Sequence, residues 1–362
     1  MASTHAPAPP VPGALNTRLC EVLGMRYPII QTAMGWVSTP ELTAASCNAG
    51  AFGFLAAATL RPEEFAPSIV QVKQLTDRPF GVNFLMEQPG AGDIVDLIIA
   101  HKVKAASYSR APNPEYIGRL KKAGVICVPT VGAVRHAQKA VQLGADVIIA
   151  QGGEGGGHTG SVPTSILIPQ VVDAVQVPVV AAGGFRDGRG LVAALAFGAT
   201  GIAMGTRFLL TAESPLPAET AKRYFAATVN DIFVTKQVDG LPQRVIMNEF
   251  VGRLESSNPL ATFLRALRSG LEYRKLSGAS IRDLLTTALT LRRGDDSLTR
   301  TQMLMAANAA IFVRRAMVEG RPAEGVLPGG VVTGVINDRP TCAELIEKIV
   351  SEAERTLATL TN

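Results

Sequence analysis

The sequence predicts an α/β protein built as a (β/α)₈ TIM barrel with an additional C-terminal helical subdomain. Eight short apolar runs alternate with helix-like stretches, and each run is continuously apolar, as in parallel strands covered by helices on both faces. After Leu210 helical stretches continue without regular strands between them. A length of 362 residues with 47% hydrophobic content suits one such barrel with an extra piece.

Turn residues bound the eight predicted strands. In chain order the strands cover 27–33, 53–59, 80–85, 105–109, 125–131, 147–152, 178–184 and 201–209. Periodicity does not show whether a sheet closes on itself, so an open, doubly wound sheet stays the alternative. No G-x-G-x-x-G motif follows the first strand, which argues against a Rossmann domain.

Helical stretches separate the strands and continue beyond them. Several open with Thr, Asp, Asn or Pro and close with Gly, as helix starts and stops should. The barrel stretches are 39–50, 61–76, 91–102, 113–124, 134–144, 165–176 and 187–198, and the later ones are 216–228, 259–276, 280–291, 299–320 and 341–360. The last is amphipathic, with Leu345, Ile346, Ile349 and Val350 near one side.

The chain therefore divides into four predicted parts. Residues 1–14 lack the basic and apolar regions of a signal peptide and are expected to be a disordered lead. Residues 15–210 form the barrel, and 211–340 form a helical lid or substrate subdomain beside its mouth. Residues 341–362 form a helix that packs on the barrel. No apolar run reaches the roughly 18 residues that a membrane span needs.

Charge and cysteine usage narrow the class of partner. The formal net charge is +5, with Lys and Arg mixed among Asp and Glu. This excludes a nucleic-acid-binding tail and allows attraction to anionic small molecules such as phosphates or coenzyme A thioesters. The four cysteines are far apart, with no C-x-x-C pair and no histidine at metal-ligand spacing. We therefore expect a reduced, cytoplasmic protein without a metal site.

Every unusual stretch follows a predicted strand, where barrel loops build the active site. "TAMGW", with Gly35, marks either a ligand wall or an ordinary turn with a buried methionine. Asn83, in an apolar strand, either bonds to loop backbone or meets a heterocycle. "AAGGFRDGRG" and "MGTRF" follow strands seven and eight, where barrels bind phosphate through backbone N–H groups, although close helix–strand packing also requires glycine.

The stretch "QGGEGGGHTG", residues 151–160, follows the sixth strand and holds six glycines and one of the four histidines. Glycine lets backbone approach a ligand closely. His158 would then stand at a pocket rim, where an imidazole suits proton transfer near neutral pH. The alternative is a histidine that only bonds to nearby backbone. His101 and His136 lie in helical stretches and His5 in the lead, so they do not compete for this role.

Together these residues resemble a known family. "PIIQTAMGWVSTPELTAASCNAGAFGFL", "GVNFL", "QGGEGGGHTG", "PVVAAGGFRDGRGLVAALAFGATGIAMGTRF" and "GVLPGGVVTGVIND" follow the order and spacing of the nitronate monooxygenases, formerly 2-nitropropane dioxygenases. Flavin-dependent enoyl-acyl-carrier-protein reductases share this barrel and the histidine motif. The resemblance covers about residues 18–350, and its most specific element is E-x-G-G-H, with a glutamine three residues before the glutamate.

The resemblance implies FMN at the barrel mouth, with His158 as the acid or base beside it. The implied contacts with the flavin ring or its ribityl chain are Ala33, Met34, Gly35, Asn83, Gln151 and Gly156, Thr130 and Gly157 are further implied cofactor-binding positions, and the implied phosphate contacts are Ala182, Gly183, Gly184, Gly205 and Thr206. Three positions depart from many relatives: Thr130 replaces a lysine, Gly155 an alanine and Val331 a glutamine. These departures suggest a modified substrate pocket, such as one for a bulky acyl thioester.

Two activities share these flavin contacts. One is oxidation of alkyl nitronates with dioxygen. The other is an NAD(P)H-dependent reduction or dehydrogenation of a coenzyme A or acyl-carrier thioester, since the chain also resembles an actinobacterial branch acting in steroid ring degradation. Arginines at 265, 268, 274, 292 and 293 slightly favour an anionic substrate. A third hypothesis is a barrel that binds a phosphorylated ligand without catalysis. The expected partner is a small-molecule substrate, with no nucleic acid and no membrane, and a homodimer is compatible with the sequence.

Overall fold

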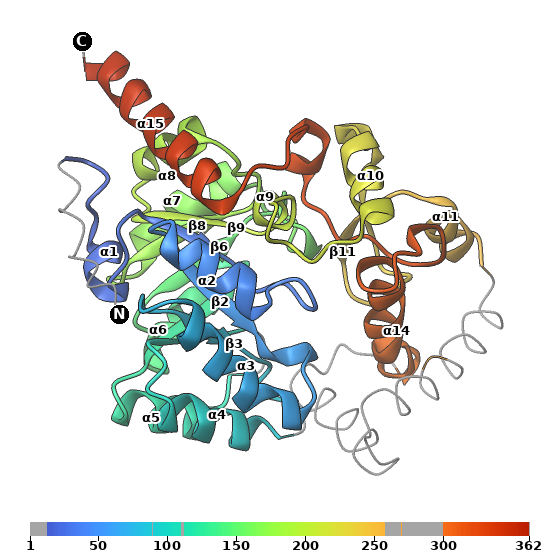
Figure 1. Cartoon of the computed structure of the whole chain (residues 1–362), viewed down its shortest axis with the longest axis horizontal. Coiled ribbons are helices and arrows are strands. Elements are labelled where there is room, and N and C mark those ends of the chain that lie inside the picture. Colours follow the sequence, from blue (N-terminus) through green and yellow to red (C-terminus); the bar gives the residue numbers. More distant parts are fainter. Residues whose placement is uncertain (1–12, 89, 110–111, 258–268, 270–299, 362) are drawn as a thin grey trace.

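The eight predicted strands form one closed parallel barrel in the computed structural model of the chain, which describes residues 13–88, 90–109, 112–257, 269 and 300–361 (Figure 1). The last barrel strand pairs with the first. The strands are β1 (Ile29–Gln31), β2 (Phe52–Ala56), β3 (Gly81–Asn83), β4 (Ala105–Ser109), β5 (Ile126–Val131), β6 (Ile148–Gln151), β8 (Val179–Ala182) and β9 (Gly201–Met204). The predicted TIM barrel is confirmed, and the open-sheet alternative is wrong because the sheet closes.

Helices surround the barrel, and some of them begin at side-chain caps that the sequence predicts. Asn113 and Asp187 accept N–H groups of the first turns of α5 and α8. The helices of this part are α1 (Arg18–Leu23), α2 (Pro40–Asn48), α3 (Pro62–Leu75), α4 (Ala91–Ala100), α5 (Pro114–Lys122), α6 (Val134–Gln142), α7 (Thr164–Ala174), α8 (Gly188–Ala196) and α9 (Thr206–Leu209), with one 3₁₀ turn, η1 (Ala57–Thr59).

The barrel interior is packed with side chains rather than open. Every residue of β2 is buried, and the rings of Phe52 and Phe54 meet edge to face with centroids 5.2 Å apart. Gly81 on β3 leaves room for this pair, because a Cβ there would lie 2.3 Å from the Phe54 ring. Since the interior is filled, a ligand can reach the barrel only at its ends, and strand-end residues of β-α loops form the functional mouth.

A second lobe lies beside the barrel (Figure 1). It contains α10 (Ala218–Ala226), η2 (Val229–Asp231), β10 (Ile232–Thr235), β11 (Gln243–Ile246), α11 (Glu249–Glu255), α14 (Arg300–Met317), η3 (Pro322–Glu324) and η4 (Val331–Val335). The sequence predicts no regular strand here, and β10 and β11 correct that. Both strands are only four residues long and lie between helices, so their apolar runs are too short to stand out.

The two strands of this lobe reach back to the barrel. β11 pairs with β10 and also with β7 (Gly157–His158), a two-residue strand inside the loop after β6. All three strands are antiparallel neighbours in the order β10-β11-β7. The loop that carries His158 is therefore part of a sheet formed with the second lobe. The predicted helices 259–276 and 280–291 lie outside the described residues, apart from Ser269.

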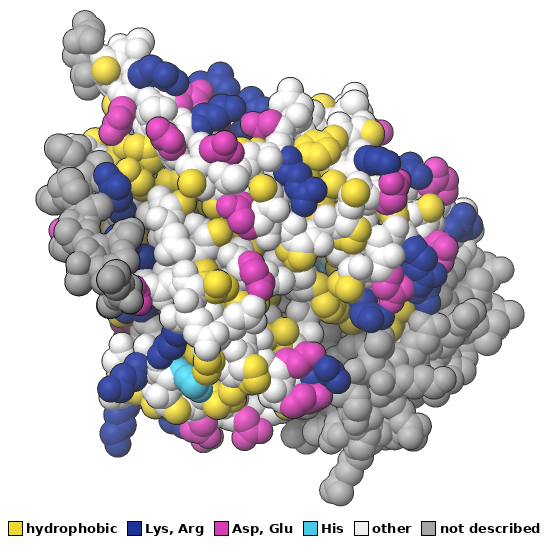
Figure 2. Space-filling view, viewed as in Figure 1, with side chains coloured by type: hydrophobic (Ala, Val, Ile, Leu, Met, Phe, Trp, Pro, Cys, Tyr) yellow, Lys and Arg dark blue, Asp and Glu magenta, His cyan; other side chains and the backbone are white. Residues whose placement is uncertain are grey.

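The last helix, α15 (Cys342–Thr361), returns to the barrel and packs on α8. The contact is so close that a Cβ on Gly188 would lie 2.3 Å from the backbone nitrogen of Ala353. Among the described helices, none has the length and apolarity to cross a lipid bilayer. On the face drawn in Figure 2, basic and acidic side chains are interspersed.

Candidate active site at the barrel mouth

The predicted site residues gather at the carboxyl-terminal mouth of the barrel. Ala33, Met34 and Gly35 follow β1; Asn83 ends β3; Thr130 lies near the end of β5; Gln151 ends β6, with Gly156, Gly157 and His158 in the loop after it; Ala182 ends β8 and precedes Gly183 and Gly184; Gly205 and Thr206 follow β9. All of them except Ala182 are partly or fully exposed, although the strands leading to them are almost wholly buried. The barrel therefore places these residues around one open end.

Strand periodicity explains why several of these side chains face the barrel axis. Val128, Ile149 and Ala203 belong to one buried cluster inside the barrel. Successive inward-facing positions along a strand are two residues apart. The next inward positions of β5 and β6 are Thr130 and Gln151, and Gly205 is the first residue after β9. These residues lie one layer above the packed interior and form the floor of the mouth.

The ends of β8 and β9 present backbone donors. Gly183 and Gly184 adopt left-handed φ angles of 101° and 84°, which favour glycine. Within the described part of the chain, no group accepts from the N–H groups of Gly184, Gly205 or Thr206. A cluster of free N–H groups at these two strand ends can bind an anion such as a phosphate.

Asn83 and Met34 lie at the ends of two other strands, β3 and β1. Asn83 donates from Nδ2 to the carbonyl and to the hydroxyl of Ser107, at 3.2 and 3.4 Å, so its recorded hydrogen bonds use only the amide nitrogen. Met34 is half-buried, and its thioether lies 3.6 Å from where a Cβ on Gly205 would stand. The ends of β1 and β9 are thus in contact across the closing seam of the barrel.

Contacts with α7 and with β11 fix the position of the loop after β6. The Glu154 carboxylate accepts from the N–H and the hydroxyl of Thr164, at 2.9 and 2.6 Å, and so caps α7. Arg244 donates from Nε and Nη2 to the carbonyl of Gly153, at 2.9 and 2.6 Å. Burial lowers the pKa of the Arg244 guanidinium, and the charge of Glu154 offsets part of that effect.

Several loop glycines are explained by close protein neighbours. A Cβ on Gly155 would lie 2.6 Å from Nε2 of Gln151, which donates to the His158 carbonyl at 2.9 Å. A Cβ on Gly156 would lie 2.6 Å from the backbone nitrogen of Gly330. The segment before η4 therefore presses on this loop, and the Val331 N–H donates to the Glu154 carbonyl at 3.0 Å. Close packing within the protein therefore requires glycine at these two positions.

His158 has two partners from the second lobe. Its Nε2 lies 2.8 Å from Oδ2 of Asp239, and Nε2 of Gln243 lies 2.7 Å from the same oxygen. The His158 side chain is 48% exposed, whereas that of Asp239 is only 7% exposed. Burial alone would raise the pKa of Asp239, but hydrogen bonds and the charge of His158 outweigh it and hold the pKa below its usual value. The site therefore contains a carboxylate behind a partly exposed imidazole.

Sequence reasoning did not identify Asp239, Gln243 or Arg244. The available signal was weak: "QVDGLPQRV" places a carboxylate before a glycine turn and two polar side chains in a short apolar strand. The residues that face His158 lie 81 and 85 positions later in the chain. Only the pairing of β11 with β7 brings them together.

A pocket of about 400 Å³ adjoins Gly183 and Gly184. Val331, one of the residues that depart from the resembled family, lies in its wall with Val229 and Val335. The arginines at 265, 268, 274, 292 and 293 lie outside the described residues.

Comparison with known proteins gives consistent matches. The family model described as nitronate monooxygenase matches residues 16–102 and 93–352. A (3aS,4S,5R,7aS)-5-hydroxy-7a-methyl-1-oxo-octahydro-1H-indene-4-carboxyl-CoA dehydrogenase from Mycobacterium tuberculosis is 47% identical over 342 residues, which cover 94% of this chain and 96% of that protein. A probable nitronate monooxygenase from Staphylococcus saprophyticus is 33% identical over 66% of this chain and 81% of its own length.

Solved structures match over nearly the whole chain. FabK from Thermotoga maritima superposes with a TM-score of 0.80 at 30% identity, and the match covers 96% of this chain and 99% of FabK. A nitroalkane oxidase from Streptomyces ansochromogenes superposes with a TM-score of 0.70 at 27% identity, over 94% and 99% of the two chains.

Proposed function

The chain belongs to the nitronate monooxygenase family of oxidoreductases, and we propose that it is an FMN-dependent dehydrogenase of a coenzyme A thioester. The observation that carries this proposal is the partly exposed His158 at the same barrel mouth as the free N–H groups of Gly184 and Gly205. An acid or base and an anion site at one barrel mouth suit flavin-dependent removal of a proton and a hydride.

The residues present fit FMN. Gly184, Gly205 and Thr206 offer three N–H groups without described acceptors, as a phosphate requires. Ala33, Gly35 and Gly205 lie at the strand ends of the open end of the barrel and are partly exposed. Bound flavin supplies the hydride acceptor, and this chain supplies position and proton transfer.

The substrate class follows from the extent of similarity. The indene-carboxyl-CoA dehydrogenase aligns over 94% of this chain at 47% identity, compared with 66% at 33% identity for the staphylococcal relative. We therefore favour a bicyclic carboxyl-CoA thioester as substrate and NAD(P)⁺ as the final electron acceptor. In this reaction His158 takes a proton from carbon, and the hydride leaves the neighbouring carbon.

Oxidation of alkyl nitronates by dioxygen is the second candidate. The matching family model and the staphylococcal relative favour it. His158 would serve there by taking a proton from the substrate or by orienting its anionic group. Both candidates place the same residues against the flavin, so only turnover separates them.

The test begins with the purified protein. Its flavin is released and identified by mass spectrometry, and bleaching of the flavin absorbance is followed anaerobically with a bicyclic acyl-CoA. Oxygen uptake with propyl nitronate measures the second activity. A protein that binds no flavin would contradict both candidates and favour a non-catalytic phosphate-binding barrel. The mass of the flavin-loaded protein in solution separates a monomer from a homodimer.

The catalytic role of His158 needs its own variant. We expect His158→Ala to retain flavin and to lose about 10²- to 10⁴-fold in turnover, the usual contribution of a general acid or base. His101→Ala is the control, because His101 ends α4 at the opposite end of the barrel. Full activity of His158→Ala would remove this residue from the reaction.

A further inference from the structure

The backbone of the small sheet sets His158 against two residues of the second lobe. In the pairing of β7 with β11, Gln243 lies opposite His158, and Arg244 lies opposite Gly157. The N–H of Thr159 donates to the carbonyl of Pro242 at 3.2 Å, which extends this contact by one residue. The position of the imidazole is therefore set by main-chain pairing, before any side-chain contact is considered.

The hydrogen positions around Asp239 follow from its chemistry. A carboxylate can only accept hydrogen bonds. Its Oδ2 is 2.8 Å from Nε2 of His158 and 2.7 Å from Nε2 of Gln243, and its Oδ1 accepts from the N–H of Leu241 at 3.1 Å. The Gln243 amide must point its NH₂ group to this oxygen, because its carbonyl would be repelled. Both nitrogens facing Oδ2 therefore carry hydrogen.

The contacts of the His158 imidazole also indicate which of its ring nitrogens carries a hydrogen. Nε2 of Gln243 is 3.2 Å from Nε2 of His158, so two donors share one carboxylate oxygen. An unprotonated Nε2 would instead direct its lone pair at the carboxylate oxygen. Neutral histidine carries one hydrogen on its ring nitrogens. If Nε2 holds it, Nδ1 has the free lone pair.

The residues that contact Nε2 of His158 are buried, whereas the imidazole itself is partly exposed. Asp239 and Gln243 are 7% and 3% exposed, whereas the His158 side chain is 48% exposed. The hydrogen bonds recorded for the ring in the described chain all involve Nε2. Nδ1 is therefore the ring nitrogen available to a ligand at the mouth.

We propose that Asp239 and Gln243 are positioning residues that hold His158 with Nε2 protonated, which makes Nδ1 the atom that exchanges the proton with substrate. This inference rests on the proposed role of His158 as acid or base. In the oxidation, the proton leaving carbon goes to Nδ1, and the resulting imidazolium keeps its Nε2–H donated to the Asp239 carboxylate. In the reverse direction Nδ1–H returns the proton.

A direct test observes the tautomer in the wild-type protein. The four histidines are labelled with ¹⁵N, and the His158 signals are assigned by their loss in His158→Ala. With flavin bound and at alkaline pH, we expect His158 to show a protonated Nε2 and an unprotonated Nδ1. The opposite tautomer would overturn the proposal whatever the activity, so this test fails independently of the proposed function.

The second test replaces the carboxylate by an amide of the same shape. We expect Asp239→Asn to lower kcat about ten- to hundredfold, because the imidazole ring loses its fixed orientation. Flavin content and the KM for the thioester should stay within twofold of wild type. Glu249→Gln is the matched control, since this carboxylate in the same lobe is 62% exposed. Wild-type kcat in Asp239→Asn, alongside an inactive His158→Ala, would overturn the positioning role and leave the proposed function intact.

Discussion

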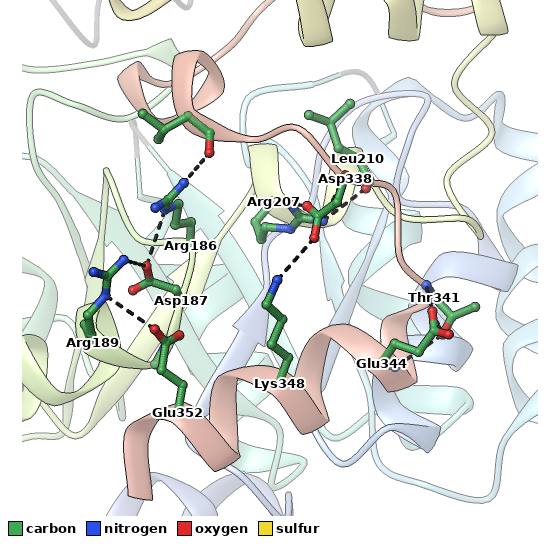
Figure 3. A network of polar contacts seen from close by, with 12 residues as sticks. Arg186, Asp187, Arg189, Arg207, Leu210, Asp338, Thr341, Glu344, Lys348 and Glu352 are labelled. Atoms are coloured by element: carbon green, nitrogen blue, oxygen red, sulfur yellow. Dashed lines mark hydrogen bonds and ion pairs between the residues drawn. The ribbon is translucent and has the colours of Figure 1, made fainter. Parts of the chain in front are cut away.

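On one side of the barrel mouth, α15 packs on α8, the helix that follows β8. On the other side, β11 of the second lobe pairs with the loop that carries His158. Arg186, Asp187, Arg189 and Glu352 link α8 to α15, and Asp338 pairs with both Arg207 and Lys348 (Figure 3). The loop depends instead on Asp239, Gln243 and Arg244. The first side is fixed by ion pairs at the barrel surface, and the second by pairing with a separate lobe.

This difference separates the side proposed to bind flavin from the side proposed to transfer the proton. The side next to α15 presents the backbone N–H groups at the ends of β8 and β9, and the position of these groups depends on the stability of the barrel. The histidine side offers one side chain whose orientation depends on a few contacts across two lobes. We therefore expect changes on the first side to affect unfolding and flavin binding, and changes on the second to affect turnover.

The largest expected effect lies at the Arg207–Asp338 pair. Arg207 is 4% exposed and its Nη1 lies 2.6 Å from the Asp338 carboxylate. Asp338→Ala removes the carboxylate partner of this buried guanidinium, which should lower the free energy of unfolding by about 2–3 kcal/mol, less than for a fully buried pair because the Asp338 side chain is 42% exposed. Chemical denaturation measures it. Glu219→Ala, which removes an exposed pair with Lys222, is the control and should change less than about 0.5 kcal/mol.

The same pair predicts a dependence on pH. Burial alone would raise the pKa of Asp338, but Arg207 and Lys348 hold it below the ordinary value of 3.8. A carboxyl whose pKa is lowered by folding stabilises the protein above its unfolded pKa, and this contribution is lost as the pH falls through its folded pKa. The difference between wild type and Asp338→Ala should therefore shrink below pH 3.8. A constant difference down to that range would contradict the ionic origin.

The two sides also differ in how far the sequence predicts them. The residues at the ends of β8 and β9 are contiguous with apolar strands, so Gly183, Gly184 and Gly205 could be placed from local pattern alone. Their helices have local caps such as Asp187. Local signals of this kind predicted the eight strands and favoured the barrel, whereas closure of the sheet is seen only in the folded structure.

Asp239 could not be found in this way, because its contact with His158 spans 81 residues and depends on the pairing of β11 with β7. Two four-residue strands between helices carry too few apolar positions for periodicity to detect. Gly156 is a second such case, because its close neighbour, Gly330, comes from a segment near the C-terminus that only tertiary packing brings next to it. Such contacts between separate lobes need the folded structure.

A second prediction tests the flavin side directly. Gly183 has a φ of 101°, and a Cβ there would lie 2.9 Å from the Thr164 hydroxyl and 3.0 Å from the Gly152 carbonyl. Gly183→Ala should therefore strain the turn by about 1–3 kcal/mol and weaken flavin binding about tenfold or more, since 1.4 kcal/mol is a factor of ten. Flavin titration of the apoprotein measures this. Gly118→Ala, an exposed helix position with open space around it, should leave binding unchanged.

The smallest expected effect concerns Gly155, on the histidine side. A Cβ at Gly155 would lie 2.6 Å from Nε2 and 2.8 Å from Cγ of Gln151, so this side chain must move. Gly155→Ala should then break the hydrogen bond from Gln151 to the His158 carbonyl. The loss of one such bond costs about 0.5–1.5 kcal/mol, which corresponds to about two- to tenfold in kcat, and we expect flavin affinity to fall by less than kcat.

A double-mutant cycle shows whether this effect passes through Gln151. If it does, Gly155→Ala should cost little further activity in a Gln151→Ala background, because the hydrogen bond is already absent. Gly252→Ala in α11, where a Cβ meets open space, is the control. Additive losses would mean that Gly155 acts elsewhere. An equal loss of flavin affinity and kcat would remove the distinction between the two sides, because the histidine loop would then hold the cofactor as well.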